Sequence, residues 1–477
     1  MKFFSAFNPI RNFKSIFSRP SRNHIQAFDG IRALASYWIF TFHNIIIYLW
    51  LSEHGILSRV LPNPILKIIL MGDSSVDIFF ILSGFLVYSR FLSELKGNTI
   101  QNLDLRIRLR YLTNFLIRRF LRLYPLIYFF ILLKILELVA LNDLKAGIPQ
   151  ILLTMFFLND MQLWNEYTPV AHSWSVATEM KTYFILLYIK NQMMKTGKDS
   201  TKLLIKIFVI ALIFYLLYVI FVPEFHRYPL YTEPWDEQLC TLFHFEPETG
   251  NFVFNHPESL DQKNLGLWFL YFGFHSRFPL ILIGCFAAFI QYRTSFPEKC
   301  QKSKPFRLMI LLIGLILFSS LFILRTTHYT SNIQIENITV LQQIIIRLFS
   351  FNRIINSIGA SLLILLIINK AGIFGNFFNY FLSLKIWIPF SNLSYSLYLT
   401  ELVPIFLLEV DIIKKFGFDW IDTRNSFLLI LKTTLVVYPI SIITFLLIEK
   451  PMINLSPERF KLEQFISGKE KKKKKIK

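Results

Sequence analysis

Cysteine is scarce in this sequence, and two common functional patterns are missing from it. The 477 residues include only three cysteines, Cys240, Cys285 and Cys300. Their spacing matches no metal-binding pattern. The topology derived below places Cys240 outside, Cys285 within the membrane and Cys300 on the cytoplasmic side. Neither an internal repeat nor a glycine-rich phosphate loop occurs. The sequence therefore argues against a disulfide-linked fold, a cysteine metal site and a P-loop nucleotide site.

Acidic residues are also few. Asp and Glu together number 31 against 51 Lys and Arg, which gives a net charge of +20. Such a charge can indicate nucleic-acid binding. Here the basic residues cluster beside apolar segments rather than on a polar domain, as in membrane proteins whose basic loops face the cytoplasm. We therefore expect no nucleic-acid partner.

Apolar residues, by contrast, are abundant. They make up 54% of the chain, and the mean hydropathy is +0.47. We predict an all-α integral membrane protein, a multi-pass bundle of about ten transmembrane helices, each some twenty residues long, near 31–50, 76–95, 122–141, 173–190, 203–222, 265–290, 306–324, 344–369, 386–409 and 426–447. The first is expected not to be a cleavable signal, because residues 22–30 are polar and no small-residue cleavage site follows.

The charges of the loops predict the topology. Segment 93–122 carries seven Lys and Arg against two acids, and segments 190–206 and 291–307 carry five basic residues each. We assign all three to the cytoplasm. Segment 223–264, with eight acids against two basic residues, is assigned to the outside as a candidate substrate platform. These assignments alternate only if the apolar stretch 147–163 is re-entrant or interfacial; an eleven-span arrangement stays open.

The topology divides the chain into three parts. Residues 1–24 form a cytoplasmic N-terminal segment, residues 25–451 the membrane domain and residues 452–477 a basic cytoplasmic tail. The tail contains five consecutive lysines, Lys471 to Lys475, which predict disorder and attraction to anionic lipid. In a bacterial cell we expect a multi-pass protein of the inner membrane with both termini cytoplasmic.

The first predicted span carries a histidine and is preceded by an arginine on the same face. His43 follows Arg32 by eleven residues, close to three helical turns, or about 16 Å along the axis. An ionisable group at mid-membrane depth is costly and indicates function. A neutral imidazole can accept a proton from a hydroxyl, so His43 is a candidate general base. The alternative is a structural histidine.

An arginine cluster precedes the third span. Arg118 and Arg119 lie four and three residues before Arg122, so two or three guanidinium groups share a direction. Such a fork suits phosphate oxygens. The alternative is a topology anchor that binds lipid head groups.

Two further spans contain polar groups. Glu179 and Tyr183 lie four residues apart on one face of the fourth span, where a buried carboxylate must pair, protonate or act in the chemistry. In the second span, Asp77 lies just inside the outer interface, and Ser83-Gly84 forms a small face. That face predicts close approach of another helix, which is the favoured interpretation, or of a ligand.

Taken in order, six motifs resemble those of the membrane-bound acyltransferase 3 family, whose members O-acylate cell-surface glycans and other hydroxyl compounds. They are Phe28-Asp29-Gly30-Ile31-Arg32 with His43, Val76-Asp77-Ile78-Phe79-Phe80-Ile81-Leu82-Ser83-Gly84-Phe85, Arg118-Arg119-Phe120-Leu121-Arg122-Leu123-Tyr124-Pro125, Trp174-Ser175-Val176-Ala177-Thr178-Glu179, Arg277-Phe278-Pro279 with Gly284, and Ser394-Tyr395-Ser396-Leu397-Tyr398-Leu399. They cover residues 25–451. Each motif alone is weakly specific, whereas six in order are strongly specific.

The resemblance implies a ten-helix core that takes an acyl group, expected to be acetyl, from cytoplasmic acyl-CoA. The acceptor would be a hydroxyl of a carbohydrate or related compound on the extracytoplasmic side. His43 is implied as the catalytic histidine, and Arg119 with Arg122 as the family's arginine pair. One departure is Glu401, where many members have a histidine.

The two lines of inference combine in one hypothesis. His43 deprotonates the acceptor hydroxyl or briefly carries the acyl group, and Glu179 orients or balances it. The predicted acyl-CoA-binding residues are Arg32, Arg118, Arg119 and Arg122. The predicted supporting residues are Asp29, Asp77, Ser83, Gly84, Tyr183, Arg277 and Tyr395. No metal is needed.

A rival interpretation is a multi-pass transporter. In it, His43, Asp77 and Glu179 form a proton relay, which accounts for ionisable residues in helices equally well but not for the arginine fork or the ordered motifs. The sequence contains no soluble esterase-like domain. We therefore expect transfer to be completed within the membrane domain or by a separate extracytoplasmic protein.

Overall fold

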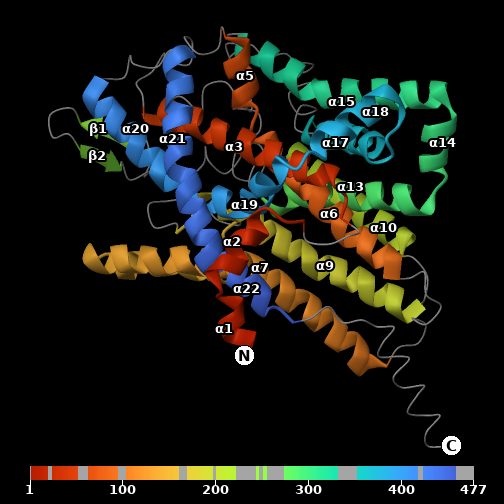
Figure 1. The fold of residues 1–477 in the computed structure, drawn as a ribbon, viewed down its shortest axis with the longest axis horizontal. Helices are drawn as coiled ribbons and strands as arrows, with labels where there is room; N and C mark the ends of the chain where they lie inside the picture. The colour runs from red at the N-terminus through yellow and green to blue at the C-terminus, as the bar shows by residue number, and fades with distance from the viewer. Residues whose placement is uncertain are drawn as a thin grey trace, which may run out of the picture.

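Helices dominate the computed structural model of the chain (Figure 1). The structure describes residues 2–19, 24–51, 63–94, 104–160, 169–196, 200–221, 243–246, 251–254, 273–330, 352–416 and 423–457. The predicted all-helical class is confirmed, with one addition. A short antiparallel hairpin pairs β1 (Phe243–Glu246) with β2 (Asn251–Phe254) within the predicted acidic loop.

The described helices follow one another along the chain. The N-terminal half contains α1 (Lys2–Ala6), α2 (Pro9–Ile16), α3 (Ala27–Leu51), α5 (Pro64–Leu70), α6 (Ser74–Glu94), α7 (Leu105–Ala140), α8 (Leu144–Met155), the 3₁₀ turn η2 (Ala171–Ser173), α9 (Trp174–Thr196) and α10 (Thr201–Phe221). The C-terminal half contains α13 (Phe274–Arg293), α14 (Phe296–Lys302), α15 (Lys304–Thr330), α17 (Asn352–Ile368), α18 (Gly372–Leu382), α19 (Trp387–Thr400), α20 (Leu402–Phe416), α21 (Thr423–Thr444), the π-helical turn η7 (Phe445–Glu449) and α22 (Lys450–Leu455).

The helix α3 lies at the centre of the bundle. It packs against α5, α6, α18, α19, α20 and α21. Figure 1 shows α15, α17 and α18 towards one end of the molecule and α20 and α21 towards the other. A residue on α3 therefore has neighbours from several distant parts of the chain, as a site inside a helix bundle requires.

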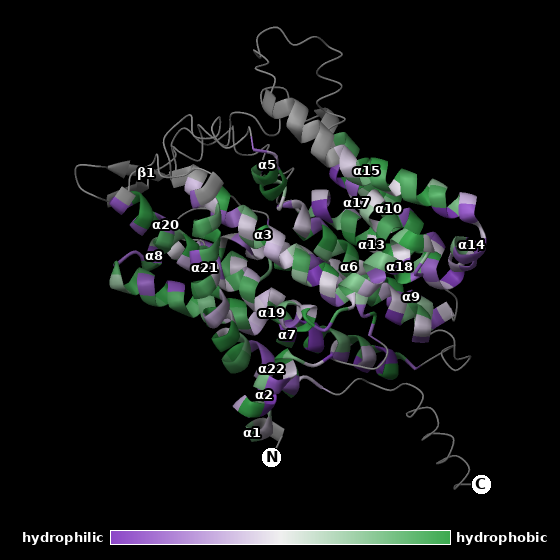
Figure 2. Ribbon diagram, turned by 45° about the horizontal axis from the view of Figure 1, so that its top comes forward, coloured by the Kyte–Doolittle hydropathy of each residue, from purple (hydrophilic) through white to green (hydrophobic). Residues whose placement is uncertain are grey.

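Apolar residues predominate along the bundle (Figure 2). Within the described ranges, four helices are long and apolar enough to cross a membrane: Ser74–Glu94, Leu105–Ala140, Phe274–Arg293 and Asn425–Leu455. The number rises to six if two sharply bent pairs, α14 with α15 and α17 with α18, each count as one span. The multi-pass character is thus established, and the count of ten spans stays a prediction.

The loop predicted over residues 93–122 is wrong in its second half, because α7 begins at Leu105 and runs for 36 residues. Its first turns bury Ile107, Tyr111 and Phe115, which recur every four residues on one face. The basic side chains between them had suggested a loop, yet arginine is a good helix former. The arginine cluster consequently lies within a continuous helix.

The doubtful apolar stretch 147–163 forms only a short helix in its described part. The helix α8 has 12 residues, or about 18 Å, less than the roughly 30 Å of a bilayer core. Residues 161–168 lie outside the described ranges. The predicted tail from residue 452 likewise begins as helix, since α22 continues to Leu455.

The predicted span 386–409 is divided into two helices at Glu401. The helix α19 ends at Thr400 and α20 begins at Leu402. Pro404 accounts for the division, because it has no N–H to donate to the carbonyl of Thr400 four residues earlier. The break places a carboxylate at a helix junction in the bundle interior.

Two glycines set the closest helix crossing. A Cβ atom on Gly84 of α6 would lie 1.9 Å from the carbonyl oxygen of Ile281, and one on Gly284 of α13 would lie 2.1 Å from that of Ile81. No side chain fits at either position without separating the helices. The packing interpretation of Gly84 is therefore confirmed.

We predict that Gly84→Ala, alone or with Gly284→Ala, destabilises the protein by about 1–3 kcal/mol, as overpacking of a core does. The melting temperature of the detergent-purified protein measures this. Gly314→Ala is the matched control, because its Cβ would come closest to the Leu363 side chain, at 3.0 Å, and would stay 3.6 Å from the nearest backbone atom, the Gly359 carbonyl oxygen. Equal melting temperatures for Gly84→Ala and Gly314→Ala would contradict the prediction.

Candidate active site

Two groups of polar residues lie at different levels along α3 and α19, which pack together. On α3, Arg32 marks the first level and His43 the second. On α19, Tyr395 lies near the charges of the first level, and the following Glu401 reaches the second. We call them the arginine level and the histidine level. Both helices run from the former to the latter.

At the histidine level, His43 pairs with Glu401. The Nδ1 atom of His43 lies 2.6 Å from Oε1 of Glu401, whose side chain is fully buried. A carboxylate that accepts the Nδ1 proton fixes the ring and leaves Nε2 to accept a proton from a substrate. From the sequence we expected Glu179 to be the carboxylate that orients His43. In this geometry the position beside His43 belongs to Glu401, because Glu179 accepts its hydrogen bonds from Ser83 and Tyr183 instead.

A second histidine completes this level. His172 of η2 is buried, and its ring centroid lies 6.0 Å from that of His43. Tyr398 lies edge-on to His172, at 4.4 Å, and donates a hydrogen bond to the His172 carbonyl at 3.0 Å. Its hydroxyl lies 3.0 Å from the hydroxyl of Ser175. The sequence reasoning missed His172 as a site residue, although it immediately precedes the Trp174 motif.

The neighbour of His43 along α3 has a structural task. Asn44 is fully buried, and its Oδ1 accepts a hydrogen bond from Thr433 of α21 at 2.5 Å. Its amide donates to the Phe40 carbonyl at 2.9 Å. These bonds attach α3 to α21 and so limit movement of the His43 backbone.

At the arginine level, Arg32 lies within electrostatic range of Arg119 and Arg122 of α7 and of Glu179. The guanidinium of Arg119 lies over the ring of Tyr183, 4.9 Å from its centroid. Arg122 is exposed. Three like charges held this close repel one another, which favours binding of an anion between them. A guanidinium group can donate two hydrogen bonds to phosphate oxygens, so Arg119 and Arg122 suit such an anion.

Arg118 points elsewhere. Its charge acts on Tyr111, two turns earlier in α7. The structure thus brings together Arg32, Arg119 and Arg122, and leaves Arg118 beside a different neighbour. The predicted acyl-CoA role of all four arginines stays a prediction.

Glu179 belongs to the arginine level. It accepts hydrogen bonds from Ser83, at 2.5 Å, and from Tyr183. The Ser83 and Tyr183 hydroxyls also lie 3.0 Å apart. Glu179 and Tyr183 thus pair along one side of α9, as expected. Because the Arg119 guanidinium lies over the Tyr183 ring, this pair also helps to position Arg119. Tyr395 donates to the backbone carbonyl of Leu123, just beyond the arginine cluster.

A buried ionic network lies near the histidine level. Asp77 accepts from Arg277 at 2.5 Å and from Arg353 at 2.8 Å, and Arg353 also pairs with Asp73. The guanidinium of Arg277 lies over the ring of Trp174. The sequence placed Asp77 and Arg277 in the site without joining them. Two acids balance two arginines, so the network itself adds no net charge next to His43.

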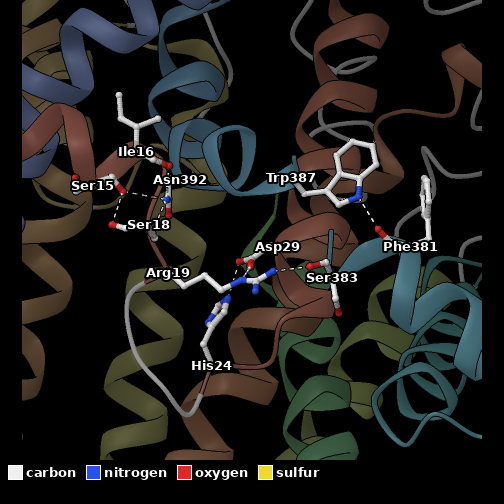
Figure 3. Close-up of polar contacts among 10 residues, drawn as sticks. All are labelled: Ser15, Ile16, Ser18, Arg19, His24, Asp29, Phe381, Ser383, Trp387 and Asn392. Carbon is white, nitrogen blue, oxygen red and sulfur yellow. Dashed lines mark hydrogen bonds and ion pairs between the residues drawn. The ribbon is translucent and has the colours of Figure 1, made fainter. Parts of the chain in front are cut away.

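Asp29 anchors the N-terminal segment to the first turn of α3 (Figure 3). Arg19 donates to Asp29 at 2.9 Å and to the Ser383 carbonyl at 2.6 Å, and His24 lies 2.6 Å from the other carboxylate oxygen. The amide of Asn392 of α19 donates to the carbonyl oxygens of Ser15, Ile16 and Ser18. Asp29 therefore holds the entry to α3, close to Arg32.

The arrangement combines a base with an anion site. His43, oriented by Glu401, can accept a proton, and the arginine level can hold phosphate groups about 16 Å away along α3. Among the described residues, no group of three or more His, Cys, Asp or Glu side chains has the arrangement of a metal site. The chemistry that fits is transfer of a group from a long, anionic donor.

Comparison with known proteins identifies the family of the chain. The family model described as an acyltransferase domain matches residues 25–448, nearly the whole chain. The chain therefore belongs to the acyltransferase 3 family and is a multi-pass membrane acyltransferase. No solved structure matches it significantly.

Two curated relatives are similar over part of the chain. The peptidoglycan O-acetyltransferase OatA of Listeria monocytogenes is 26% identical over 207 residues, which are 40% of this chain and 28% of that protein. An uncharacterized protein of Haemophilus influenzae is 28% identical over 265 residues, which are 52% of this chain and 87% of that protein. The match thus spans about a quarter of the length of the Listeria enzyme.

We predict that Glu401→Gln lowers kcat for acyl transfer by about 10²-fold or more, because an amide cannot balance an imidazolium at His43. The KM for acyl-CoA should change little, since Glu401 lies away from the arginine level. Initial rates of the purified protein with acetyl-CoA measure both constants.

Glu409→Gln is the matched control. It removes another fully buried carboxyl group from α20 and leaves the His43 pair intact, so its kcat should stay near that of the wild type. A wild-type kcat for Glu401→Gln would show that Glu401 does not orient the base.

Proposed function

We propose that this acyltransferase moves an acyl group, acetyl in the first instance, from cytoplasmic acyl-CoA to a hydroxyl of a carbohydrate or related acceptor on the extracytoplasmic side. The observation that carries the proposal is the separation of the arginine and histidine levels along one pair of helices. A donor with a phosphate-rich head and a distant thioester matches it.

The sidedness rests on the loop charges. Ten spans with both termini in the cytoplasm put the basic segments 93–122 and 190–206 on one side and the acidic segment 223–264 on the other. Arg119 and Arg122 then lie at the cytoplasmic mouth of the bundle. In a bacterium the protein resides in the inner membrane.

The donor binds by its phosphates at the arginine level. Arg119 and Arg122, with Arg32, contact the CoA phosphates, while Tyr183 and Glu179 hold Arg119 in place. The pantetheine arm runs between the helices and brings the thioester to His43. Arg118, which lies beside Tyr111, contributes charge at the mouth.

Transfer takes place at His43. The acceptor oxygen attacks the thioester carbonyl carbon while its proton passes to Nε2 of His43, and Glu401 balances the imidazolium. The carbon–sulfur bond then breaks, and the CoA thiolate takes the proton back from His43. Ester and CoA thiol are the products, and no metal is required.

The acceptor class is inferred from the chemistry and from the relative. The Listeria protein is named a peptidoglycan O-acetyltransferase, which supports a glycan hydroxyl as acceptor. A separate extracytoplasmic protein can complete delivery to a polymer too large to reach the bundle interior.

We predict that the purified wild-type protein transfers label from radioactive acetyl-CoA to an N-acetylglucosamine trimer, a soluble glycan fragment. His43→Ala should reduce the rate by about 10²–10⁴-fold, the usual contribution of a general base, and should lower the melting temperature, because it leaves the buried Glu401 without its partner. Full transfer by His43→Ala would exclude His43 from the mechanism. A wild-type protein without any transfer would contradict the proposed donor or acceptor.

The double variant Arg119→Ala/Arg122→Ala should raise the KM for acetyl-CoA by about tenfold or more, since charged hydrogen bonds are lost. The remaining KM should depend less on salt, because phosphate contacts are screened by ions. Lysine at both positions should restore only part of the apparent affinity for acetyl-CoA, because an ammonium group cannot form a bidentate fork. Arg106→Ala, exposed on the same helix, is the control, and an equal effect there would reduce the cluster to a general surface charge.

A further inference from the structure

The mechanism above does not use His172, the second histidine of the histidine level. Its side chain is buried, with 3% exposure. Neither ring nitrogen has a hydrogen-bond partner among the residues that the structure describes. A neutral imidazole has one donor and one acceptor, and burying both without partners is costly. In a purely structural role, phenylalanine would fill the same space without this cost.

The backbone of η2 holds His172 in place. Its carbonyl oxygen accepts hydrogen bonds from Tyr398, at 3.0 Å, and from Ser175, at 3.2 Å. Ser173 donates to the Val170 carbonyl at 2.7 Å. The ring also packs against Tyr398. The position of the turn and of the ring therefore does not depend on hydrogen bonds from the ring nitrogens.

The ring lies beside His43 and apart from the arginine level. Along η2 and α9, Glu179 of the arginine level follows His172 by seven residues, or about 10 Å, and along α3 His43 follows Arg32 by about 16 Å. Both histidines therefore lie away from the arginines. In the proposed topology that end faces the extracytoplasmic side, from which the acceptor arrives.

We propose that His172 binds the acceptor hydroxyl and presents it to His43. This inference rests on the proposed function. A hydroxyl has one proton and two lone pairs. Its proton points to Nε2 of His43, one lone pair accepts the N–H of His172, and the other attacks the thioester carbon. The proton and electron balance of the transfer is unchanged, because His172 keeps its own proton.

The test separates binding of the acceptor from binding of the donor. His172→Phe keeps an aromatic ring against Tyr398 and removes both nitrogens. With the purified full chain, acetyl-CoA and the N-acetylglucosamine trimer, this variant should raise the KM for the trimer about tenfold, as loss of one hydrogen bond implies. The KM for acetyl-CoA should stay within about twofold. His172→Asn, which retains an N–H, should recover part of the trimer affinity.

His275→Phe is the matched control. It replaces a half-buried histidine whose ring centroid lies 6.5 Å from that of Tyr215. The KM for the trimer should stay unchanged. An unchanged trimer KM in His172→Phe would overturn the inference, and so would an equal rise in both KM values, which would signify a general loss of structure. A wild-type protein without transfer would overturn the proposed function itself, and this inference with it.

Discussion

The packing of α3 against α19 is the constraint on which the rest of the site depends. His43 comes from the first of these helices, and Glu401 follows the second at its end. A shift of either helix by one turn, about 5.4 Å, would separate the pair. Asn44 attaches α3 to α21, and the N-terminal segment attaches α19 and the start of α3. The bundle is thus built to preserve one register.

Charge is distributed differently at the two levels. Near the histidine level, Asp77 and its two arginines are buried and mutually paired, which limits the cost of removing them from water. At the arginine level, Arg122 is exposed and like charges gather. A closed, balanced network stabilises a fold, whereas an open excess of one sign attracts a ligand of the other sign. This contrast distinguishes the scaffold from the proposed donor site.

Local geometry could be predicted from the sequence, and long-range pairing could not. The helical period alone places Arg32 and His43 on one face, and it joins Glu179 with Tyr183. The partner of His43 lies 358 residues away, and nothing in the periodicity of either helix indicates it. The same holds for Arg353, whose contact with Asp77 spans 276 residues. The start of α7 was missed for another reason, because its arginines indicated loop charge more strongly than helix propensity.

The position of Glu401 conflicts with local preference, and that conflict is informative. It follows the C-terminus of α19, where exposed carbonyl groups favour a positive charge over a carboxylate. Pro404 adds to this, since the Thr400 carbonyl receives no N–H from it. A carboxylate kept at such a point, fully buried, needs a compensating partner, and His43 is that partner. Positions that break a local rule without a structural benefit are expected at functional sites. The imidazolium that forms during transfer would be stabilised both by Glu401 and by the carbonyl ends of α19. A histidine at this position would satisfy the helix end but could not supply the negative charge.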